Sequence, residues 1–345
     1  METNFEKIRN EEHLNELLSS PGKEVIRMFS QIDGDIIFLG VSGKIGPYLA
    51  RMAKRACDEA GVEKRITGVD RFEIPGQREI LEKLGIETIQ GNLLDHDFLN
   101  KLPPLKNVFF LAGMKFGAVD NLPLTWAVNS YLPGMAAEHF RDSRIVVFST
   151  GCVYPLVEVN SGGSVESDPP VAIGEYAQSC LGRERMFEYV SKKYGTPVVL
   201  IRLNYSVEMR YGVLVDIGTK VFNKQPVDLK MGYFNVIWQG DMNDFVLRSM
   251  EYTDTPARIL NITGPEILSV REVALEFGKL FGVNPDFINQ EAETALLSNS
   301  SEAYRLFGKP KVPAKMVIGW IAEWLKDGKR LLGKPTHFEV RDGKY

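Results

Sequence analysis

The stretch "DIIFLGVSGKIGPYLARMAKRACDEAG" (residues 35–61) joins a short apolar run, a loop with regularly spaced glycines and an amphipathic segment. Continuous apolar runs such as 35–39 are typical of strands buried on both faces of a parallel sheet. The amphipathic segment ends at Gly61, a natural helix stop. Its apolar residues recur at the spacing of one helix face: Leu49, Met52, Ala53, Ala56 and Cys57. The stretch therefore predicts a strand, a glycine turn and a helix, with Cys57 in the core.

The same alternation continues along the chain. Further β-rich apolar runs lie at 65–69, 86–90, 107–111, 144–148 and 197–201. Six such strands separated by helical segments predict an α/β fold with a doubly wound parallel sheet. Four parts are expected: a helical N-terminal extension at 1–33, the sheet domain at 34–204, mainly a smaller lobe at 205–330 with a short strand at 258–262, and a polar tail at 331–345.

The composition limits the possible partners. The 345 residues carry a formal net charge of −4 with the charges scattered, which argues against a nucleic-acid surface. Three widely spaced cysteines and four isolated histidines form neither a disulfide framework nor a metal-ligand pattern, so no metal is expected. The first residues are charged where a signal peptide is apolar, and no apolar run reaches the roughly 18 residues of a membrane span. We expect a cytoplasmic protein without a membrane partner.

The glycines of the loop, Gly40, Gly43 and Gly46, lie between the first strand and the first helix. Glycines at such a junction allow a tight turn and let backbone N–H groups and the helix N-terminus approach a pyrophosphate. The second strand ends at Asp70, where an acid can hold the ribose hydroxyls of an adenosine. The pattern predicts that residues 34–204 bind NAD. Asp70 would repel the 2′-phosphate of NADP, although Arg71 beside it leaves NADP open.

Further segments follow one another in a characteristic order: "GNLLD" (91–95), "LAGMKFG" (111–117), "WAVNSYLPGMAAE" (126–138), "FSTGCVYP" (148–155), "VESDPPVAIGEYAQS" (165–179) and "LSNSSEAYRLFGKPKV" (297–312). With the glycine loop, they resemble the extended short-chain dehydrogenase/reductases, the NAD-dependent epimerase/dehydratase family that includes UDP-galactose 4-epimerase. The resemblance covers roughly residues 35 to 327. It implies a Rossmann-type sheet, a smaller C-terminal substrate-binding lobe and a homodimer formed through helices that flank the sheet.

The resemblance also implies which residues bind the cofactor. In this family the glycine loop, the ends of several strands, a helix asparagine and the catalytic tyrosine contact NAD. The corresponding residues here are Gly40, Ser42, Gly43, Lys44, Ile45, Gly46, Asp70, Arg71, Asn92, Leu93, Leu111, Ala112, Gly113, Lys115, Asn129 and Tyr176.

Catalysis in this family is hydride transfer to or from the nicotinamide, with a tyrosine as acid/base and a serine or threonine beside it. These positions correspond to Tyr176 and Thr150. A phenol with a pKa of about 10 is a poor base near neutral pH unless its anion is stabilised. The family's lysine provides this stabilisation from one helical turn along, and it also holds the nicotinamide ribose. Here Cys180 stands in the lysine's place, and a thiol carries no positive charge.

Three interpretations of Cys180 remain open, in this order of preference. A buried thiol packs under the cofactor and reduced activity is retained; Tyr176 no longer acts as a base and the fold binds nucleotide without turnover; or Cys152 and Cys180 form a redox-sensitive pair. A second tyrosine–lysine pair, Tyr189 and Lys193, has the right interval. It lies at the helix end and much farther from Thr150 than Tyr176 does, so Tyr176 is the corresponding tyrosine.

The substrate side departs from the family's pattern. The arginines that hold a diphosphate are missing near Phe234 and within 289–299, and Tyr205 replaces a nucleotide-contacting asparagine. These departures put a nucleotide sugar in doubt and make a smaller sugar, polyol or sugar acid plausible. The expected substrate residues are Thr150, Gly151, Cys152, Asn204, Tyr205, Arg210, Tyr233 and Trp238, with Tyr211 and Asn235 as further candidates.

Together these observations predict an NAD(P)-dependent oxidoreductase, epimerase or dehydratase that acts on a sugar or sugar-like substrate, with Tyr176, Thr150 and Cys180 in the catalytic segment. The alternative is a catalytically weak or silent NAD-binding regulatory or scaffold protein of the same fold.

Overall fold

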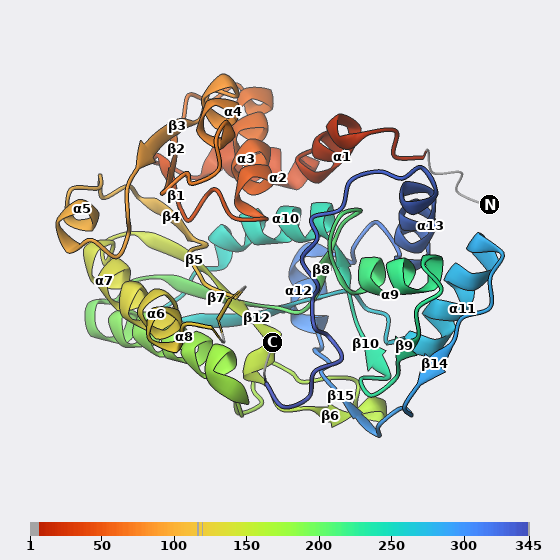
Figure 1. The fold of residues 1–345 in the computed structure, drawn as a ribbon. Helices are drawn as coiled ribbons and strands as arrows, with labels where there is room; N and C mark the ends of the chain where they lie inside the picture. Colours follow the sequence, from red (N-terminus) through yellow and green to blue (C-terminus); the bar gives the residue numbers. More distant parts are fainter. Residues whose placement is uncertain (1–6, 116, 119, 344–345) are drawn as a thin grey trace.

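The computed structural model describes residues 7–115, 117–118 and 120–343. The first six residues of the expected N-terminal extension and the last two of the expected tail lie outside the described residues. A parallel sheet runs through the molecule in the order β12-β7-β5-β4-β1-β2-β3 (Figure 1). Its strands are β1 (Ile36–Leu39), β2 (Ile66–Asp70), β3 (Glu87–Gln90), β4 (Asn107–Phe110), β5 (Arg144–Thr150), β7 (Val198–Leu203) and β12 (Arg258–Ile262).

The Rossmann-type sheet is the one predicted, with one strand more than expected. The short strand at 258–262 was expected in the smaller lobe, but it pairs in parallel with β7 at the edge of the central sheet. The chain therefore returns to the sheet after entering the second lobe. A five-residue apolar run does not reveal its partner strand, because pairing depends on long-range packing.

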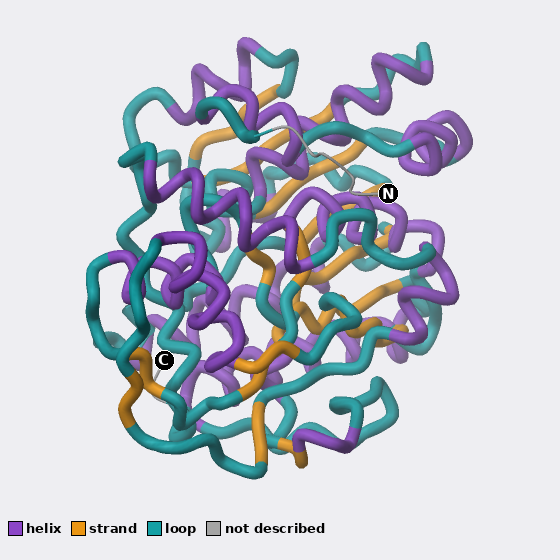
Figure 2. Tube along the Cα trace, turned by 90° about the vertical axis from the view of Figure 1, so that its right-hand side faces the viewer, coloured by secondary structure: helices purple, strands orange, loops and turns teal. Residues whose placement is uncertain are grey.

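Helices cover both faces of the sheet (Figures 1 and 2). One face carries α2 (Lys23–Gln31), α3 (Gly46–Ala60) and α10 (Gln239–Arg248); the other carries α6 (Leu122–Trp126), α7 (Leu132–His139) and α8 (Gly174–Tyr194). A π-helical turn, Ala127–Tyr131, joins α6 to α7. Around the sheet lie α1 (Glu11–Leu18), α4 (Gln77–Lys83), α5 (His96–Asn100) and α12 (Ser301–Phe307).

The helix that the opening stretch predicts is α3. Leu49, Met52 and Cys57 of the predicted stripe are buried, and the helix ends at Gly61 in the left-handed conformation that glycine favours. At the N-terminus of α3, a side chain in place of Gly46 would overlap the Val41 carbonyl. Glycine at this position therefore lets the helix end pack directly on the loop.

The second lobe has a core of its own, in which Phe234, Phe277 and Trp324 are buried. It is built around α9 (Val213–Phe222), α11 (Val270–Phe281) and α13 (Ala314–Lys326). Short two-residue strands complete the fold: β6 (Val157–Glu158), β8 (Ser206–Val207), β9 (Val227–Asp228), β10 (Tyr233–Phe234), β11 (Ile237–Trp238), β13 (Leu268–Ser269), β14 (Phe287–Ile288) and β15 (Thr294–Ala295). Within the described ranges, no helix combines the length and apolar character needed to cross a bilayer.

The C-terminal tail runs from the second lobe to the N-terminus of α8. Leu332 N–H donates to the Arg210 carbonyl, and Phe338 is buried against Phe234. At the far end, a side chain in place of Gly174, the first residue of α8, would collide with the Gly343 backbone. The tail (residues 331–343) thus bridges the two lobes, as its dark blue trace in Figure 1 also shows.

Candidate active site

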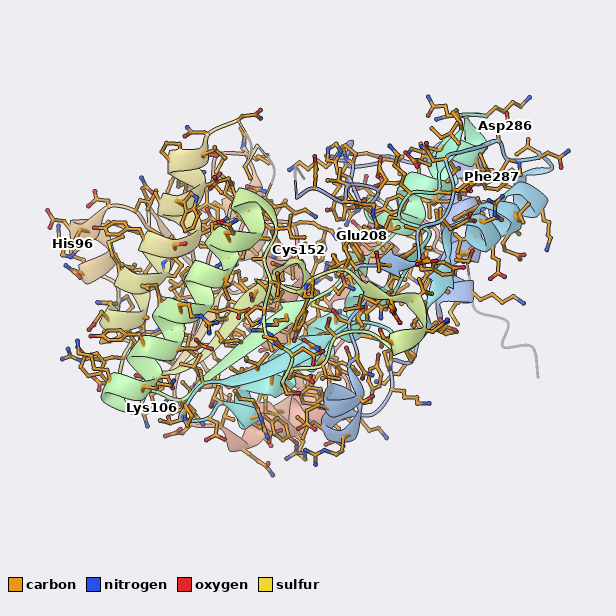
Figure 3. The ribbon with its side chains drawn as sticks, turned by 90° about the horizontal axis from the view of Figure 1, so that it is seen from below. His96, Lys106, Cys152, Glu208, Asp286 and Phe287 are labelled. Carbon is orange, nitrogen blue, oxygen red and sulfur yellow. The ribbon has the colours of Figure 1, made fainter. Side chains whose placement is uncertain are left out.

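Two adjoining cavities lie at the carboxyl ends of the parallel strands, of about 350 and 550 Å³. This edge of a doubly wound sheet is where such folds bind ligands. Figure 3 places Cys152, which lines the smaller cavity, near the middle of the molecule where the two lobes meet. Both cavities are lined by Gly40, Gly43, Leu111, Gly113, Met114, Lys115 and Lys334. They are therefore two halves of one elongated site, referred to below as the 350 Å³ cavity and the 550 Å³ cavity.

The glycine loop forms the floor between the two halves. Gly40 has φ of +89°, and a Cβ added there would lie 2.6 Å from the Ala112 nitrogen. The Asp70 carboxylate accepts hydrogen bonds from the backbone N–H of Ser42 (2.8 Å) and of Arg71 (2.7 Å). Asp70 thereby ties the end of β2 to the loop and presents its carboxylate to the 550 Å³ cavity.

The residues expected to bind the cofactor, Asn129 excepted, line the two cavities. The 550 Å³ cavity is lined by Gly40, Ser42, Gly43, Asp70, Arg71, Asn92, Leu93, Leu111, Ala112, Gly113 and Lys115. The 350 Å³ cavity adds Lys44, Ile45, Gly46 and Tyr176.

Asn129 lines neither cavity; it is fully buried in the π-helical turn. Its side-chain oxygen accepts from the Met114 N–H (2.8 Å), and its side-chain nitrogen donates to the Met114 carbonyl (2.9 Å) and to Ser179 Oγ (3.0 Å). Asn129 thus fixes the cavity-lining segment at Met114 to α8. The segment after β4 lies between Asn129 and the cavity, so in this structure Asn129 acts on the site through Met114.

The expected catalytic pair lies together in the 350 Å³ cavity. Tyr176 enters it from the first turn of α8, and Thr150 from the end of β5. Thr150 Oγ1 accepts a hydrogen bond from the Cys152 N–H (3.1 Å), which leaves its own hydroxyl hydrogen available to a ligand. Burial raises the pKa of Tyr176 well above its ordinary value, and the neighbouring Cys180 and Cys152 act in the same direction.

Cys180 does not line either cavity. It packs with Val153 and Tyr154 and forms a side-chain hydrogen bond with Tyr176. Burial raises the pKa of the Cys180 thiol to about 11, the opposite of what a reactive thiolate needs. This disfavours the redox interpretation and makes Cys180 a packing residue.

The second tyrosine–lysine pair lies elsewhere. Tyr189 is exposed near the C-terminal end of α8, and Lys193 pairs with Glu138 on α7 (3.3 Å). Neither residue reaches the cavities.

Half of the residues expected to bind substrate lie in the 350 Å³ cavity: Thr150, Cys152, Asn204 and Tyr205. Tyr211, a further candidate, lines it as well. Asn235, the other, lies behind the wall and accepts a hydrogen bond from the Asn204 side chain (2.8 Å).

The other four residues, Gly151, Arg210, Tyr233 and Trp238, are not among the residues that line the cavities. Gly151 is buried behind Thr150, against Asn204 and Ser298. Arg210 is turned away by an ion pair with Glu208 (3.2 Å) and a hydrogen bond to the Tyr48 hydroxyl (2.8 Å). Tyr233 belongs to β10 of the second lobe, and Trp238 packs edge-to-face on Trp320.

Arg183, Lys334 and Thr336 are among the cavity residues that were not anticipated. Arg183 lies seven residues after Tyr176, a spacing that returns to the same helix face, so the periodicity of α8 could have revealed it. Lys334 and Thr336 belong to the tail, and no local pattern signals that a tail crosses a cleft.

The 350 Å³ cavity is positively charged. It is lined by Lys44, Lys115, Arg183 and Lys334, and no carboxylate lines it among the residues that the structure describes. Burial lowers the pKa of Lys44 to about 7, with Arg210 and Lys115 acting in the same direction and Glu208 opposing them. The Lys44 ammonium lies over the Tyr211 ring, 4.1 Å from its centroid. In the described part of the chain, no three His, Cys, Asp or Glu side chains gather as a metal site would require.

Comparison with solved structures identifies other proteins that share this fold. Pal from Bacillus thuringiensis is 20% identical with a TM-score of 0.69, over 86% of this chain and 100% of that one. A UDP-glucose 4-epimerase from Thermotoga maritima is 17% identical with a TM-score of 0.69, over 85% and 99%. A UDP-glucuronic acid 4-epimerase from Bacillus cereus is 16% identical with a TM-score of 0.70, over 85% and 99%.

No curated protein matches the sequence significantly. A family model described as "NAD dependent epimerase/dehydratase family" matches residues 36–206, from β1 to the end of the β7 region. This range contains the glycine loop, Asp70, Thr150 and Tyr176, which line the two cavities. Residues 36–206 of this chain therefore form a domain of the NAD-dependent epimerase/dehydratase family.

Proposed function

We propose that this protein uses NAD to oxidise, reduce or epimerise a small anionic sugar, such as a sugar acid, with Tyr176 as the proton-exchanging residue. The observation that carries the proposal is the meeting of Tyr176 and Thr150 in a cavity that continues into the site of the glycine loop. When bound, NAD would supply the hydride acceptor or donor.

The residues present fit NAD. The cradle at Gly40 and Gly46 has no room for side chains, as a closely approaching pyrophosphate requires. Asp70 lines the 550 Å³ cavity, where it would accept hydrogen bonds from ribose hydroxyls. Arg71 already pairs with Glu73 (3.2 Å), so it offers little free charge to a 2′-phosphate, and we propose NAD rather than NADP as the cofactor.

Two side chains of this protein would take part in proton transfer. Thr150 would donate a hydrogen bond to the reacting oxygen of the substrate, and Tyr176 would exchange a proton with that oxygen. Because burial raises the pKa of Tyr176, the phenol is held protonated in the empty site. A positive charge close by is needed before it can act as a base.

The substrate class follows from the charge and closure of the 350 Å³ cavity. The Bacillus cereus structure contains UDP-4-deoxy-4-fluoro-glucuronic acid and NAD. In this chain the tail, through Lys334 and Thr336, forms part of the wall of that cavity. Phe338 of the tail covers Phe234, near which the family's diphosphate arginine would stand. Lys115, Arg183 and Lys334, with no carboxylate among the described lining residues, favour an anionic substrate, and the tail that forms part of the wall favours a small one over a nucleotide sugar.

A panel of ligands tests the proposal. The full chain should bind NAD and reduce or oxidise it with one or more small sugar acids or sugar phosphates, followed by nicotinamide absorbance; epimerisation would be followed by NMR of the sugar. UDP-glucose and UDP-glucuronic acid serve as the competing class. Turnover of a UDP-sugar alone would replace the small-anion proposal, and NAD binding without turnover of any sugar would favour the silent NAD-binding alternative.

Proton uptake on NAD binding should identify Lys44. The pKa of about 7 lies below the ordinary 10.5, so Lys44 is largely neutral at about pH 8 in the empty protein. A bound anion raises this pKa, and the lysine then takes up a proton. Calorimetry at about pH 8 in two buffers of different protonation enthalpy should give an uptake of up to about one proton, declining below pH 7.

Two variants control that measurement. Lys44→Met should abolish the proton uptake. Lys54→Met, which removes a lysine that pairs with Asp58 on α3, should leave the uptake unchanged. An undiminished uptake in Lys44→Met would contradict the assignment.

Loosening the tail should weaken substrate binding. The Thr336 N–H and hydroxyl both donate to Asp216 Oδ2, at 2.8 and 2.6 Å, and hold the tail on α9. Thr336→Val removes one donor from the partly buried Asp216 carboxylate, at a cost of about 1–3 kcal/mol. We expect faster hydrogen exchange across residues 331–343 and a KM raised more than kcat is lowered. Thr336→Ser keeps the hydroxyl and should resemble the parent; equal effects of both substitutions would exclude the hydrogen bond as the cause.

The homodimer implied by the family resemblance stays a prediction. Exposed apolar side chains on the α6–α8 face, Trp126, Tyr131, Met186 and Tyr189, are consistent with it. Analytical ultracentrifugation of the full chain would decide it.

A further inference from the structure

We propose that Arg183 supplies the positive charge that Cys180 cannot, and that it acts on Tyr176 as a positioning residue of the active site. The inference rests on the proposed function in assigning proton exchange to Tyr176. It goes further by identifying a substitute, within the same helix, for the cation that the family places one turn after the tyrosine.

The geometry of α8 brings the three residues together. Tyr176, Cys180 and Arg183 follow at i, i+4 and i+7, which places them on one face of the helix. Arg183 lines the 350 Å³ cavity together with Tyr176, although its side chain is only 5% exposed. The guanidinium therefore reaches the wall of the reaction cavity from one turn beyond the family's lysine position.

The charge of Arg183 is not neutralised. Its Nη1 donates to the Phe148 carbonyl (2.7 Å) and its Nη2 to Asn129 Oδ1 (2.8 Å), both uncharged acceptors. Its Nε has no hydrogen-bond partner, and within the described ranges no carboxylate lies at ion-pair distance. The next residue, Glu184, is instead committed to Arg202. A buried arginine without a carboxylate partner is costly, so its retention calls for a role.

The surrounding residues leave room for the guanidinium. A Cβ in place of Gly113 would lie 2.6 Å from Arg183 Nη2, so glycine permits the close approach. At position 180 the chain has a small neutral thiol on the helix face that Arg183 shares. A lysine there would bring a second buried cation beside the first.

Several groups face Tyr176, and Arg183 is the cation among those that shift its pKa. Cys180 on the same helix and Cys152 after β5 raise the pKa of the phenol, whereas Arg183 lowers it against the effect of burial. The other charged or titratable side chains that line the cavity are Lys44, Lys115, Tyr211 and Lys334.

The test measures the phenol directly. The protein is labelled with a trifluorinated tyrosine, whose phenol ionises several pH units below that of tyrosine and so brings the raised pKa of Tyr176 within reach. The Tyr176 signal is assigned in the ¹⁹F NMR spectrum by its loss in Tyr176→Phe. Arg183→Met should raise the pKa of this phenol by about one to three pH units. Arg183→Lys should raise it less. Arg183→Met with Cys180→Lys should lower it again, because the charge returns to the family's position.

Controls separate electrostatics from structure. Arg185→Met removes an exposed arginine of the same helix, paired with Glu188, and should leave the Tyr176 titration unchanged. If Arg183→Met does not fold, Arg183→Gln, which is neutral but keeps a donor, takes its place. An unchanged Tyr176 titration in the neutral variant overturns the proposal and leaves Arg183 as a tether between Phe148 and Asn129.

Turnover supplies a second readout once a substrate is known. Cys180→Lys should lower activity in the parent protein but raise activity in the Arg183→Met variant. These opposite effects would not be expected if Arg183 only tethered Phe148 to Asn129. If no sugar is turned over by any variant, the proposed function fails, but the titration still decides the role of Arg183.

Discussion

Tyr176→Phe is expected to lower kcat by about 10²–10⁴-fold while NAD binding stays within a few-fold of the parent. The substitution removes one hydroxyl, the group that would exchange a proton with the substrate. Tyr176 lines the 350 Å³ cavity. Asp70 and part of the glycine loop line the 550 Å³ cavity, where the adenosine half of NAD would be held. The phenol therefore contributes to the chemistry and little to cofactor affinity.

The measurement compares steady-state rates with NAD affinity from nicotinamide fluorescence. Thr150→Val, which removes the neighbouring hydroxyl and preserves the side-chain shape, should also reduce kcat while NAD affinity stays unchanged. Tyr189→Phe, at the exposed tyrosine of the same helix, is the matched control and should leave both quantities unchanged. Full activity of Tyr176→Phe would remove the tyrosine from the mechanism.

Glu184→Leu is expected to lower the free energy of unfolding by about 3–5 kcal/mol. Glu184 and Arg202 form an ion pair (2.7 Å) in which the side chains are 0% and 1% exposed, and Ser149 donates to the same carboxylate (2.5 Å). Removing the carboxylate strands the Arg202 charge in the core between α8, β5 and β7. Because β5 carries Thr150 and α8 carries Tyr176, the ion pair also sets the separation of the two proposed catalytic side chains.

Urea unfolding of single and double variants tests this account. Glu184→Leu combined with Arg202→Met leaves no unpaired charge and should be clearly more stable than Glu184→Leu alone. Arg305→Met, which breaks an exposed pair with Glu302 on α12, should change stability by no more than about 1 kcal/mol. A double variant as unstable as Glu184→Leu would show that shape, and not charge, dominates at this position.

The parallel sheet was predictable because its signals are local. Each predicted strand is a run of a few apolar residues, and the turn after β1 needs glycine at Gly40 for its positive φ. Asp70 could be predicted from local sequence as well, because it stands at the end of the second apolar strand. The strand at 258–262 was placed wrongly because its partner, β7, lies more than fifty residues away.

The site was predictable where a residue's position follows from the end of a strand or the face of a helix. Thr150 at the end of β5 and Tyr176 on α8 line the cavity for this reason. Three of the expected residues that do not line the cavity, Arg210, Tyr233 and Trp238, come from the second lobe, where the direction of a side chain depends on its packing partners. Arg210 is drawn away by Glu208, Glu11 and Tyr48, and Trp238 by Trp320.

By itself the sequence determined the sheet, the glycine loop and the tyrosine–threonine pair, because hydrophobic period, turn chemistry and helix spacing act over a few residues. Only the tertiary structure decided that the tail closes the 350 Å³ cavity, that Asn129 positions a loop, and that Arg183, which forms no ion pair with any described carboxylate, faces the cavity beside Tyr176. These features depend on hydrogen bonds between buried groups that are far apart in sequence. Such bonds form only when the distant segments pack together.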